Sequence, residues 1–320
     1  MPATHIAQIH EYLCNTISDF APDPAYTRLL LHILTETRES NQAATVLPLL
    51  ACQAAGGTLH QAVPVASAWR ALYLAAHIMD DVEDGDIAAW GGDTITSAEL
   101  INAATGFFAV TNLILLQNHE NIAPDTRHAL VQAFNHVTLQ MAGGQHRDLK
   151  TKTLHNIEAY LQGIGAKSGQ FFALALTGGA IVARADAKKT ERFGKFGYNL
   201  GIIVQLLNDI VGFYTEGHHS DLLARKRTLP LLFAEITASP EQRTRLQQLL
   251  SQAGQSKSAR RQLRDLVREQ GGDTCTLAEI TRHQTLALSC LMPGNNAETP
   301  LRRYLEDFLQ RELSRIYTPI

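Results

Sequence analysis

Apolar residues recur at helical spacing along nearly the whole chain, and this pattern limits the fold more than any other feature. In stretches such as LINAATGFFAVTNLILL and GIIVQLLNDIVGFY, apolar side chains return every three or four residues. Turn dipeptides flanked by the alternating pattern of β-strands are missing from the sequence. The sequence therefore predicts an all-α fold of about ten or more helices.

Residues that start helices support this prediction. Thr96 and Glu99 form a capping-box pattern, in which each side chain accepts a hydrogen bond from the other residue's backbone N–H. Pro124 and Pro240 suit the first turn of a helix, where the missing N–H is not needed. No Pro/Ser-rich linker, repeat or low-complexity tract divides the chain, so we expect a single all-α domain over residues 1–320.

Composition and charge exclude several classes of protein. The chain has 28 Lys and Arg against 31 Asp and Glu and no dominant basic block, so we expect no nucleic-acid partner. The four cysteines form no CxxC pair, which favours a reducing compartment and a cytoplasmic location. The N-terminus lacks a signal-peptide pattern, and the longest nearly apolar run, FFAVTNLILL, is too short to cross a bilayer. We therefore expect a cytoplasmic protein that does not span the membrane.

The stretch AHIMDDVEDGDIAAW concentrates Asp80, Asp81, Glu83, Asp84 and Asp86 within seven residues. Like charges this close repel one another, so the cluster either holds a cation or spreads its side chains into water. On a helix, Asp80 and Asp84 lie one turn apart on one face, with Asp81 turned aside by roughly 100°. Two such carboxylates suit Mg²⁺, which binds few protein carboxylates and leaves positions for phosphate oxygens.

The acidic cluster has two other interpretations. An EF-hand is excluded, because Val82 and Gly91 would occupy the third and twelfth loop positions, where a metal ligand and a bidentate Glu are needed. A solvated acidic helix end is the second alternative and stays open at this point.

A second stretch, GIIVQLLNDIVGFYTEGHHSDLLARKRTLPLLFA, supports the metal interpretation. Asn208, Gly212 and Glu216 are spaced i, i+4, i+8 and so line one face of a helix that follows an apolar run.

With these stretches the chain resembles the trans-isoprenyl diphosphate synthases and their class I terpene synthase relatives, over roughly residues 40–235. Five landmarks occur in the family's order: DDVED, GGQHRDL, AKSGQFF, GIIVQLLNDIVGF and SDLLARKRTLP. The resemblance implies the class I isoprenoid synthase fold, a helical bundle around a deep central cavity with two metal motifs facing each other across its mouth. It also implies Mg²⁺ as cofactor, a prenyl diphosphate substrate and a homodimer.

The resemblance also implies roles for particular residues. The expected metal ligands are Asp80, Asp81, Asp84, Asn208, Asp209 and Glu216. The expected diphosphate and substrate contacts are Lys167, Gln205, Arg225, Lys226 and Arg227. Lys167 matches the family's KT or KS position and is also expected to act in catalysis, with Asp80, Asp84, Asn208 and Glu216. Lys226 matches the family's basic motif, whereas solvated surface charge explains its two arginine neighbours equally well.

The chain also departs from the family in two places. Chain-elongating members bind isopentenyl diphosphate with basic segments on both sides of the first motif, but from residue 39 to 126 the only Lys or Arg here is Arg70. Their second motif reads DDxxD, whereas Asn208 to Gly212 read NDIVG, followed by Glu216. This resembles the NDxxSxxxE triad of terpene synthases, with Gly212 in place of the middle Ser. Both departures weaken the case for elongation.

The sequence thus predicts Mg²⁺-dependent ionisation of an allylic prenyl diphosphate, with a terpene synthase as the first hypothesis. The small residues Ala75 and Ala76, at positions where bulk closes the family's hydrocarbon tunnel, predict a long prenyl substrate. The alternative is a prenyltransferase, which elongates prenyl chains or, as in the ComQ-type proteins that share the IMDDxED wording, transfers the prenyl group to another acceptor. A non-catalytic subunit of a prenyl synthase is the third hypothesis.

Overall fold

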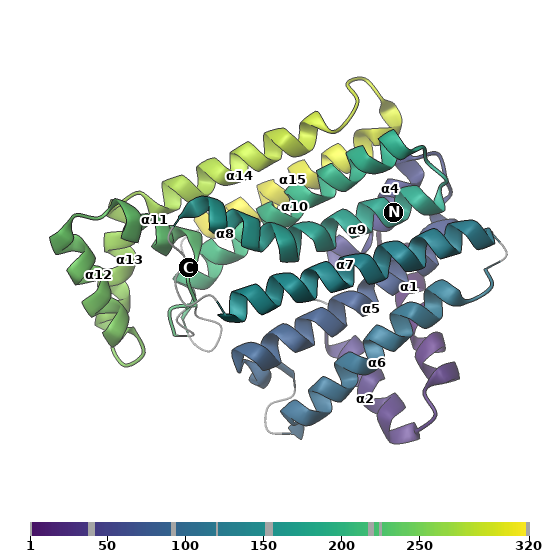
Figure 1. The fold of residues 1–320 in the computed structure, drawn as a ribbon, viewed down its shortest axis with the longest axis horizontal. Coiled ribbons are helices and arrows are strands. Elements are labelled where there is room, and N and C mark those ends of the chain that lie inside the picture. Colours follow the sequence, from purple (N-terminus) through teal and green to yellow (C-terminus); the bar gives the residue numbers. More distant parts are fainter. Residues whose placement is uncertain are drawn as a thin grey trace. The chain divides into compact units, whose positions relative to one another are not determined.

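All the regular structure in the described residues is helical, and no strand occurs among them (Figure 1). The computed structural model describes residues 2–37, 42–90, 94–119, 121–150, 156–216, 221–223 and 226–317. The prediction of an all-α fold is confirmed.

The chain divides into two compact units. The first comprises Met1–His136, Leu174–Gly194 and Met292–Leu301, and the second comprises Val137–Ala173, Lys195–Leu291 and Arg302–Ile320. Four of the five boundaries fall within long helices, and the fifth lies between Leu291 and Met292, in the connection that follows α14. The single domain over residues 1–320 stays a prediction.

The first unit is built around helix α5 (Leu59–Asp84). Helices that pack against it include α1 (Pro2–Phe20), α3 (Gln42–Thr45), α4 (Leu47–Ala54) and α6 (Ser97–Leu116). Helix α2 (Pro24–Glu36) packs on α1 and α6. The short helices η1 (Ile87–Trp90) and η4 (Asn296–Glu298) also belong to this unit.

The sequence of α5 explains both its position and its end. Residues 62–72 are buried without interruption, and Trp69 is among the largest fully buried side chains, so the helix forms the core of the unit. Gly85 adopts φ 76°, the left-handed conformation that glycine adopts at low cost, and the Asp86 N–H donates to the Asp81 carbonyl at 2.8 Å. The acidic residues up to Asp84 therefore lie on the last turns of α5, and Asp86 follows the cap.

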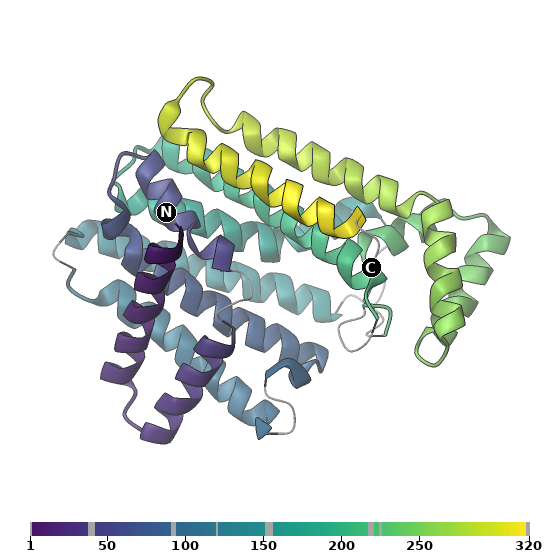
Figure 2. The ribbon, with the colours of Figure 1, turned by 180° about the vertical axis from the view of Figure 1, so that it is seen from behind.

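The second unit holds the remaining helices. They are α8 (Ile157–Ile164), the π-helical turn η3 (Gly165–Gly169), α11 (Leu229–Thr237), α12 (Pro240–Ala253), α13 (Lys257–Glu269) and α14 (Gly272–Ser289). Helices α12 and α13 form a side-by-side pair, and α11 packs on α13 and α14 (Figure 2). Four helices contribute to both units: α7 (Pro124–Lys150), α9 (Gln170–Val182), α10 (Ala187–Tyr214) and α15 (Thr299–Tyr317).

The predicted helix starts are confirmed. Thr96 caps α6, and both hydrogen bonds of the capping box with Glu99 are present. Pro124 begins α7, and Pro240 begins α12. Each of these signals acts within one turn of backbone, which is why sequence alone reveals it.

Helices α6 and α10 are long and apolar enough, by length and composition alone, to cross a membrane. Buried residues make up 44% of the apolar stretch of α6 and 61% of that of α10. Core helices of globular proteins pass the same test. The four cysteines form no disulfide.

Candidate active site

The acidic cluster presents two carboxylates on one face at the end of α5. Asp80 is half-buried, Asp84 is exposed, and the two lie one helical turn apart, as the sequence predicts. Carboxylate oxygens are the ligands that Mg²⁺ prefers, and a site near solvent leaves room for water and phosphate oxygens. Asp80 and Asp84 therefore fit a divalent cation.

Asp81 contacts a different set of residues. Its carboxylate accepts a hydrogen bond of 2.6 Å from the indole Nε1 of Trp90, and the Nδ1 of His77 lies 3.6 Å away. The imidazole of His77 stands beside the ring of Trp90, with centroids 5.2 Å apart. Burial raises the pKa of Asp81, and its acidic neighbours add to this effect, whereas His77 and Trp90 oppose it. Asp81 thus ties η1 to α5, and its role as a metal ligand stays a prediction.

Lys167 lies within the π-helical turn η3, between α8 and α9. Its Nζ is 3.4 Å from a carboxylate oxygen of Asp148 on α7, and its side chain is 30% exposed. Gly144 lets α7 approach this turn, since a Cβ there would come within 3.2 Å of Ala166 and Lys167. Single π-turns inside helical segments often occur at functional sites. The landmarks GGQHRDL and AKSGQFF are therefore neighbours in space.

Asp209 is the most enclosed carboxylate of the second motif. It is 4% exposed and accepts hydrogen bonds from the Tyr160 hydroxyl, the Leu229 N–H at 3.1 Å and the Gln205 amide at 3.2 Å. Burial raises the pKa of Asp209 to about 6, although these donors favour the charged form. Asp209 thus joins α8, α10 and the start of α11.

Sequence reasoning missed Tyr160. A tyrosine on a half-apolar helix reads as ordinary packing, and its partner lies 49 residues further along the chain. The available signal was indirect: a buried Asp directly after Asn208 needs several donors, and a buried tyrosine hydroxyl needs an acceptor.

The remaining positions of the second motif differ from one another. Asn208 is exposed, whereas Gly212 offers no side chain and a Cβ there would overlap the carboxylate of Asp221. Glu216 pairs with the guanidinium groups of Arg260 and Arg264. Burial acts to raise the pKa of Glu216, but its bonds to the two arginines outweigh that effect and hold the pKa below its usual range.

The basic segment before α11 is partly described. Lys226 is exposed, and its N–H donates to the carbonyl of Asp221 at 2.8 Å, whereas Arg227 lies 3.5 Å from a carboxylate oxygen of Glu235. Arg225 lies outside the described residues. The hydroxyl of Thr228 is buried and has no hydrogen-bond partner among the described residues, a situation that water or a ligand oxygen would relieve.

The first unit contains Arg70 and the two alanines expected at the tunnel floor. Arg70 is 5% exposed, its Nη2 donates to the Thr37 carbonyl at 2.5 Å, and its guanidinium lies over the ring of Tyr73. The only Lys or Arg between positions 39 and 126 is therefore buried in the core. Of the two small residues expected at the tunnel floor, Ala75 is fully buried and Ala76 is half-buried.

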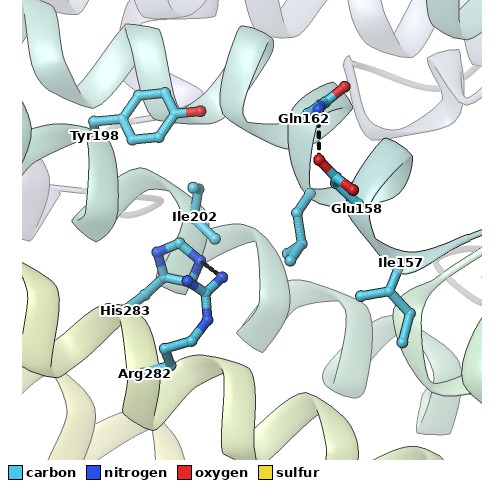
Figure 3. A pocket seen from close by; sticks show the side chains of 8 residues that line it. Ile157, Glu158, Gln162, Tyr198, Ile202, Arg282 and His283 are labelled. Carbon is cyan, nitrogen blue, oxygen red and sulfur yellow. Dashed lines mark hydrogen bonds between the residues drawn. The ribbon is translucent and has the colours of Figure 1, made fainter.

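The second unit also contains a hollow of about 410 Å³ between α8, α10 and α14 (Figure 3). Ile157, Leu161 and Ile202 give it an apolar surface, and Arg282 and His283 approach it from α14. None of the residues singled out from sequence lines it. In the described part of the chain, no group of three or more His, Cys, Asp and Glu side chains is arranged to hold a metal ion.

Comparison with known proteins decides the family. The family model for polyprenyl synthetases matches residues 27–267, which is most of the chain. The chain belongs to the polyprenyl synthetase family. It is 24% identical to the (2E,6E)-farnesyl diphosphate synthase of Mycobacterium tuberculosis over 252 residues, which cover 75% of this chain and 70% of that protein. It is also 24% identical to the geranylfarnesyl diphosphate synthase of Methanosarcina mazei, over 68% of this chain and 72% of the relative.

Solved structures confirm the fold of this polyprenyl synthetase family member. The crystal structure of a decaprenyl diphosphate synthase from Rhodobacter capsulatus superposes with a TM-score of 0.82 at 19% identity, over 99% of this chain and 97% of that one. The predicted class I isoprenoid synthase fold is thereby confirmed. Family members are prenyltransferases, and the relatives named above are chain-elongating synthases, so the alternative prediction of a prenyltransferase fits better than a terpene synthase.

Proposed function

We propose that this polyprenyl synthetase family protein is a Mg²⁺-dependent prenyltransferase whose substrate is an allylic prenyl diphosphate. The observation that carries the proposal is the pair of carboxylates of Asp80 and Asp84, held one turn apart by the capped end of α5. The family match and the names of the relatives support the reaction class.

Each set of residues has its own part in this proposal. Asp80 and Asp84 would hold Mg²⁺, which when bound supplies positive charge that neutralises the departing diphosphate. In the second unit, Lys167 and Lys226 supply cationic side chains of the kind that bind diphosphate oxygens, and the exposed Asn208 supplies an amide oxygen. The assignments of Gln205, Arg225 and Arg227 to the substrate stay predictions.

Two outcomes are compatible with ionisation of an allylic diphosphate, and a specific observation supports each. Chain elongation, in which isopentenyl diphosphate is the acceptor, is favoured by the names of the relatives. The second candidate is reaction without isopentenyl diphosphate, by transfer to another acceptor or by a terpene synthase route. It is favoured by Arg70, the only Lys or Arg from 39 to 126, which is buried against Thr37 and Tyr73.

The test is to incubate the protein with allylic diphosphates of increasing length and Mg²⁺, with and without labelled isopentenyl diphosphate. Label in a longer prenyl diphosphate supports elongation, and diphosphate release without label supports the second candidate. Asp80→Asn should abolish both activities, whereas Glu83→Gln, which removes an exposed acid of the same cluster, should retain them. A protein that releases no diphosphate from any substrate would refute the proposal and favour a non-catalytic subunit.

The proposal extends to assembly and location. Helix α6 carries exposed apolar residues, Ile101 at 44% and Leu116 at 62%, and Glu99 is its only charged residue. An apolar face of this kind suits a homodimer contact. A cytoplasmic location agrees with four cysteines that form no disulfide.

A further inference from the structure

Three arginines of α13 lie along the side that meets the C-terminal end of α10. Arg260, Arg264 and Arg268 are spaced i, i+4, i+8, so they share one face of the helix. The Nε of Arg260 is 2.9 Å from one carboxylate oxygen of Glu216, and the Nη1 of Arg264 bonds to the other. The guanidinium of Arg268 lies 5.1 Å from the centre of the Tyr214 ring.

The arginines also bind the backbone at the ends of two helices. The Nε of Arg264 donates to the Phe213 carbonyl at 3.0 Å, and its Nη2 donates to the Thr215 carbonyl at 2.9 Å. Arg260 donates to the carbonyl of Ala253, the last residue of α12, at 2.7 Å. The last carbonyls of a helix lack partners within the helix, and a cation is favourable there. Arg264 therefore caps α10, and Arg260 links that cap to α12.

The helices that these ion pairs join also share an apolar cluster. Phe213 of α10 is fully buried against Leu263 and Val267 of α13, together with residues of α11 and α12. The side chains of Arg260 and Arg264 are only 8% and 13% exposed. Two cations this enclosed require a counter-charge, and Glu216 is the carboxylate with which both pair.

These contacts conflict with a metal role for Glu216. A carboxylate that moved to a metal ion would leave two enclosed cations without a counter-charge. The middle position of the triad supplies no metal ligand either, because Gly212 has no side chain and the carboxylate of Asp221 fills the adjacent space. We infer that Glu216 is the anchor that fixes α13 on the end of α10, and that it is not a metal ligand.

The test measures stability in EDTA, without substrate or metal. Glu216→Gln should lower the Tm and should make trypsin cleave α13 at least about fivefold faster, because Arg260 and Arg264 lose their counter-charge and hold α13 on α10 less firmly. A carboxylate that serves only to bind metal predicts the opposite sign, since its neutralisation in EDTA removes repulsion from nearby acids. Glu306→Gln, at an exposed glutamate of α15, is the matched control and should behave as the wild type.

Arg264→Lys tests the same ion pair by changing the arginine instead of the glutamate. It keeps the positive charge but cannot bond to Glu216 and both carbonyls in the same geometry, so the Tm in EDTA should fall. This variant decides the question if Glu216→Gln is not recovered as a folded protein. An unchanged or raised Tm in EDTA for the variant that is recovered would overturn the inference.

A second readout follows Mn²⁺ binding by electron paramagnetic resonance, with inorganic diphosphate present. Glu216→Gln should bind Mn²⁺ within about twofold of the wild type, whereas Asp80→Asn should weaken binding about tenfold or more. A tenfold loss in Glu216→Gln would make Glu216 a ligand and overturn the inference. If the wild type binds no Mn²⁺, the proposed function fails, and the EDTA experiment still decides the role of Glu216.

Discussion

Helix α14 contains a histidine that the fold keeps neutral, and this predicts a loss of stability in mild acid. His283 is 5% exposed, its Nδ1 lies 2.7 Å from Oδ1 of Asn199, and its Nε2 lies 2.9 Å from Nη2 of Arg282. Arginine only donates, so Nε2 must accept, and Nδ1–H donates to Asn199. Burial, followed by the charge of Arg282, lowers the pKa of His283 to about 4, although Glu279 opposes this shift.

The sign and size of the effect follow from proton uptake. Between its ordinary pKa of 6.5 and its folded pKa of about 4, the imidazole takes up a proton only when the chain unfolds. The full contribution of His283 to stability is present above the ordinary pKa and is lost as the pH falls toward the folded pKa. The loss is about 2 kcal/mol between about pH 7.5 and about pH 5, out of about 3 kcal/mol in total.

The assay compares urea unfolding of the wild type and His283→Asn at these two pH values, followed by far-UV circular dichroism. The Nδ2 of the new asparagine can still donate to Asn199, but the side chain no longer titrates, so the other groups cancel in the comparison. The wild type should lose about 2 kcal/mol more than the variant, and His128→Asn, at an exposed histidine, should follow the wild type. Equal losses in wild type and His283→Asn would refute the assignment of a buried neutral imidazole.

Three further predictions concern the candidate site. Gly212→Ala should lower the free energy of unfolding by roughly 1–3 kcal/mol in urea titrations, because the new Cβ overlaps Asp221, and most of the loss should disappear in an Asp221→Ala background. Tyr160→Phe should cost about 1–3 kcal/mol by the same measurement, since the enclosed carboxylate next to Asn208 loses a donor; a neutral result would contradict the network. Ala76→Phe, at the half-buried position expected at the tunnel floor, should shift turnover toward shorter allylic diphosphates. Ala75→Phe, at a position without exposed surface, should mainly lower the Tm. An unchanged length preference in a folded Ala76→Phe protein would contradict the floor assignment.

The part of the site that sequence could predict is local. The face shared by Asp80 and Asp84 follows from 3.6 residues per helical turn, and the end of α5 follows from Gly85. Family landmarks, read in order, were enough to single out Lys167 as a candidate diphosphate contact. The resemblance also suggested the prenyltransferase alternative, but the Asn208 motif and the missing basic segments favoured a terpene synthase. Sequence could not choose reliably between the two, because a motif does not report which acceptor the enzyme uses.

The all-α fold, the helix starts and the acidic face were determined by the sequence alone, because each depends on contacts within one or two turns of backbone. Only tertiary structure decided that Arg70 is enclosed, that Tyr160 supports Asp209, and that Glu216 pairs with arginines. The partners in the last two cases are 49 and 44 residues apart, and they meet because α8 and α13 pack against α10. A carboxylate looks the same in sequence whether its counter-charge is a metal ion or an arginine, and the packing of helices distant along the chain decides which one lies within reach.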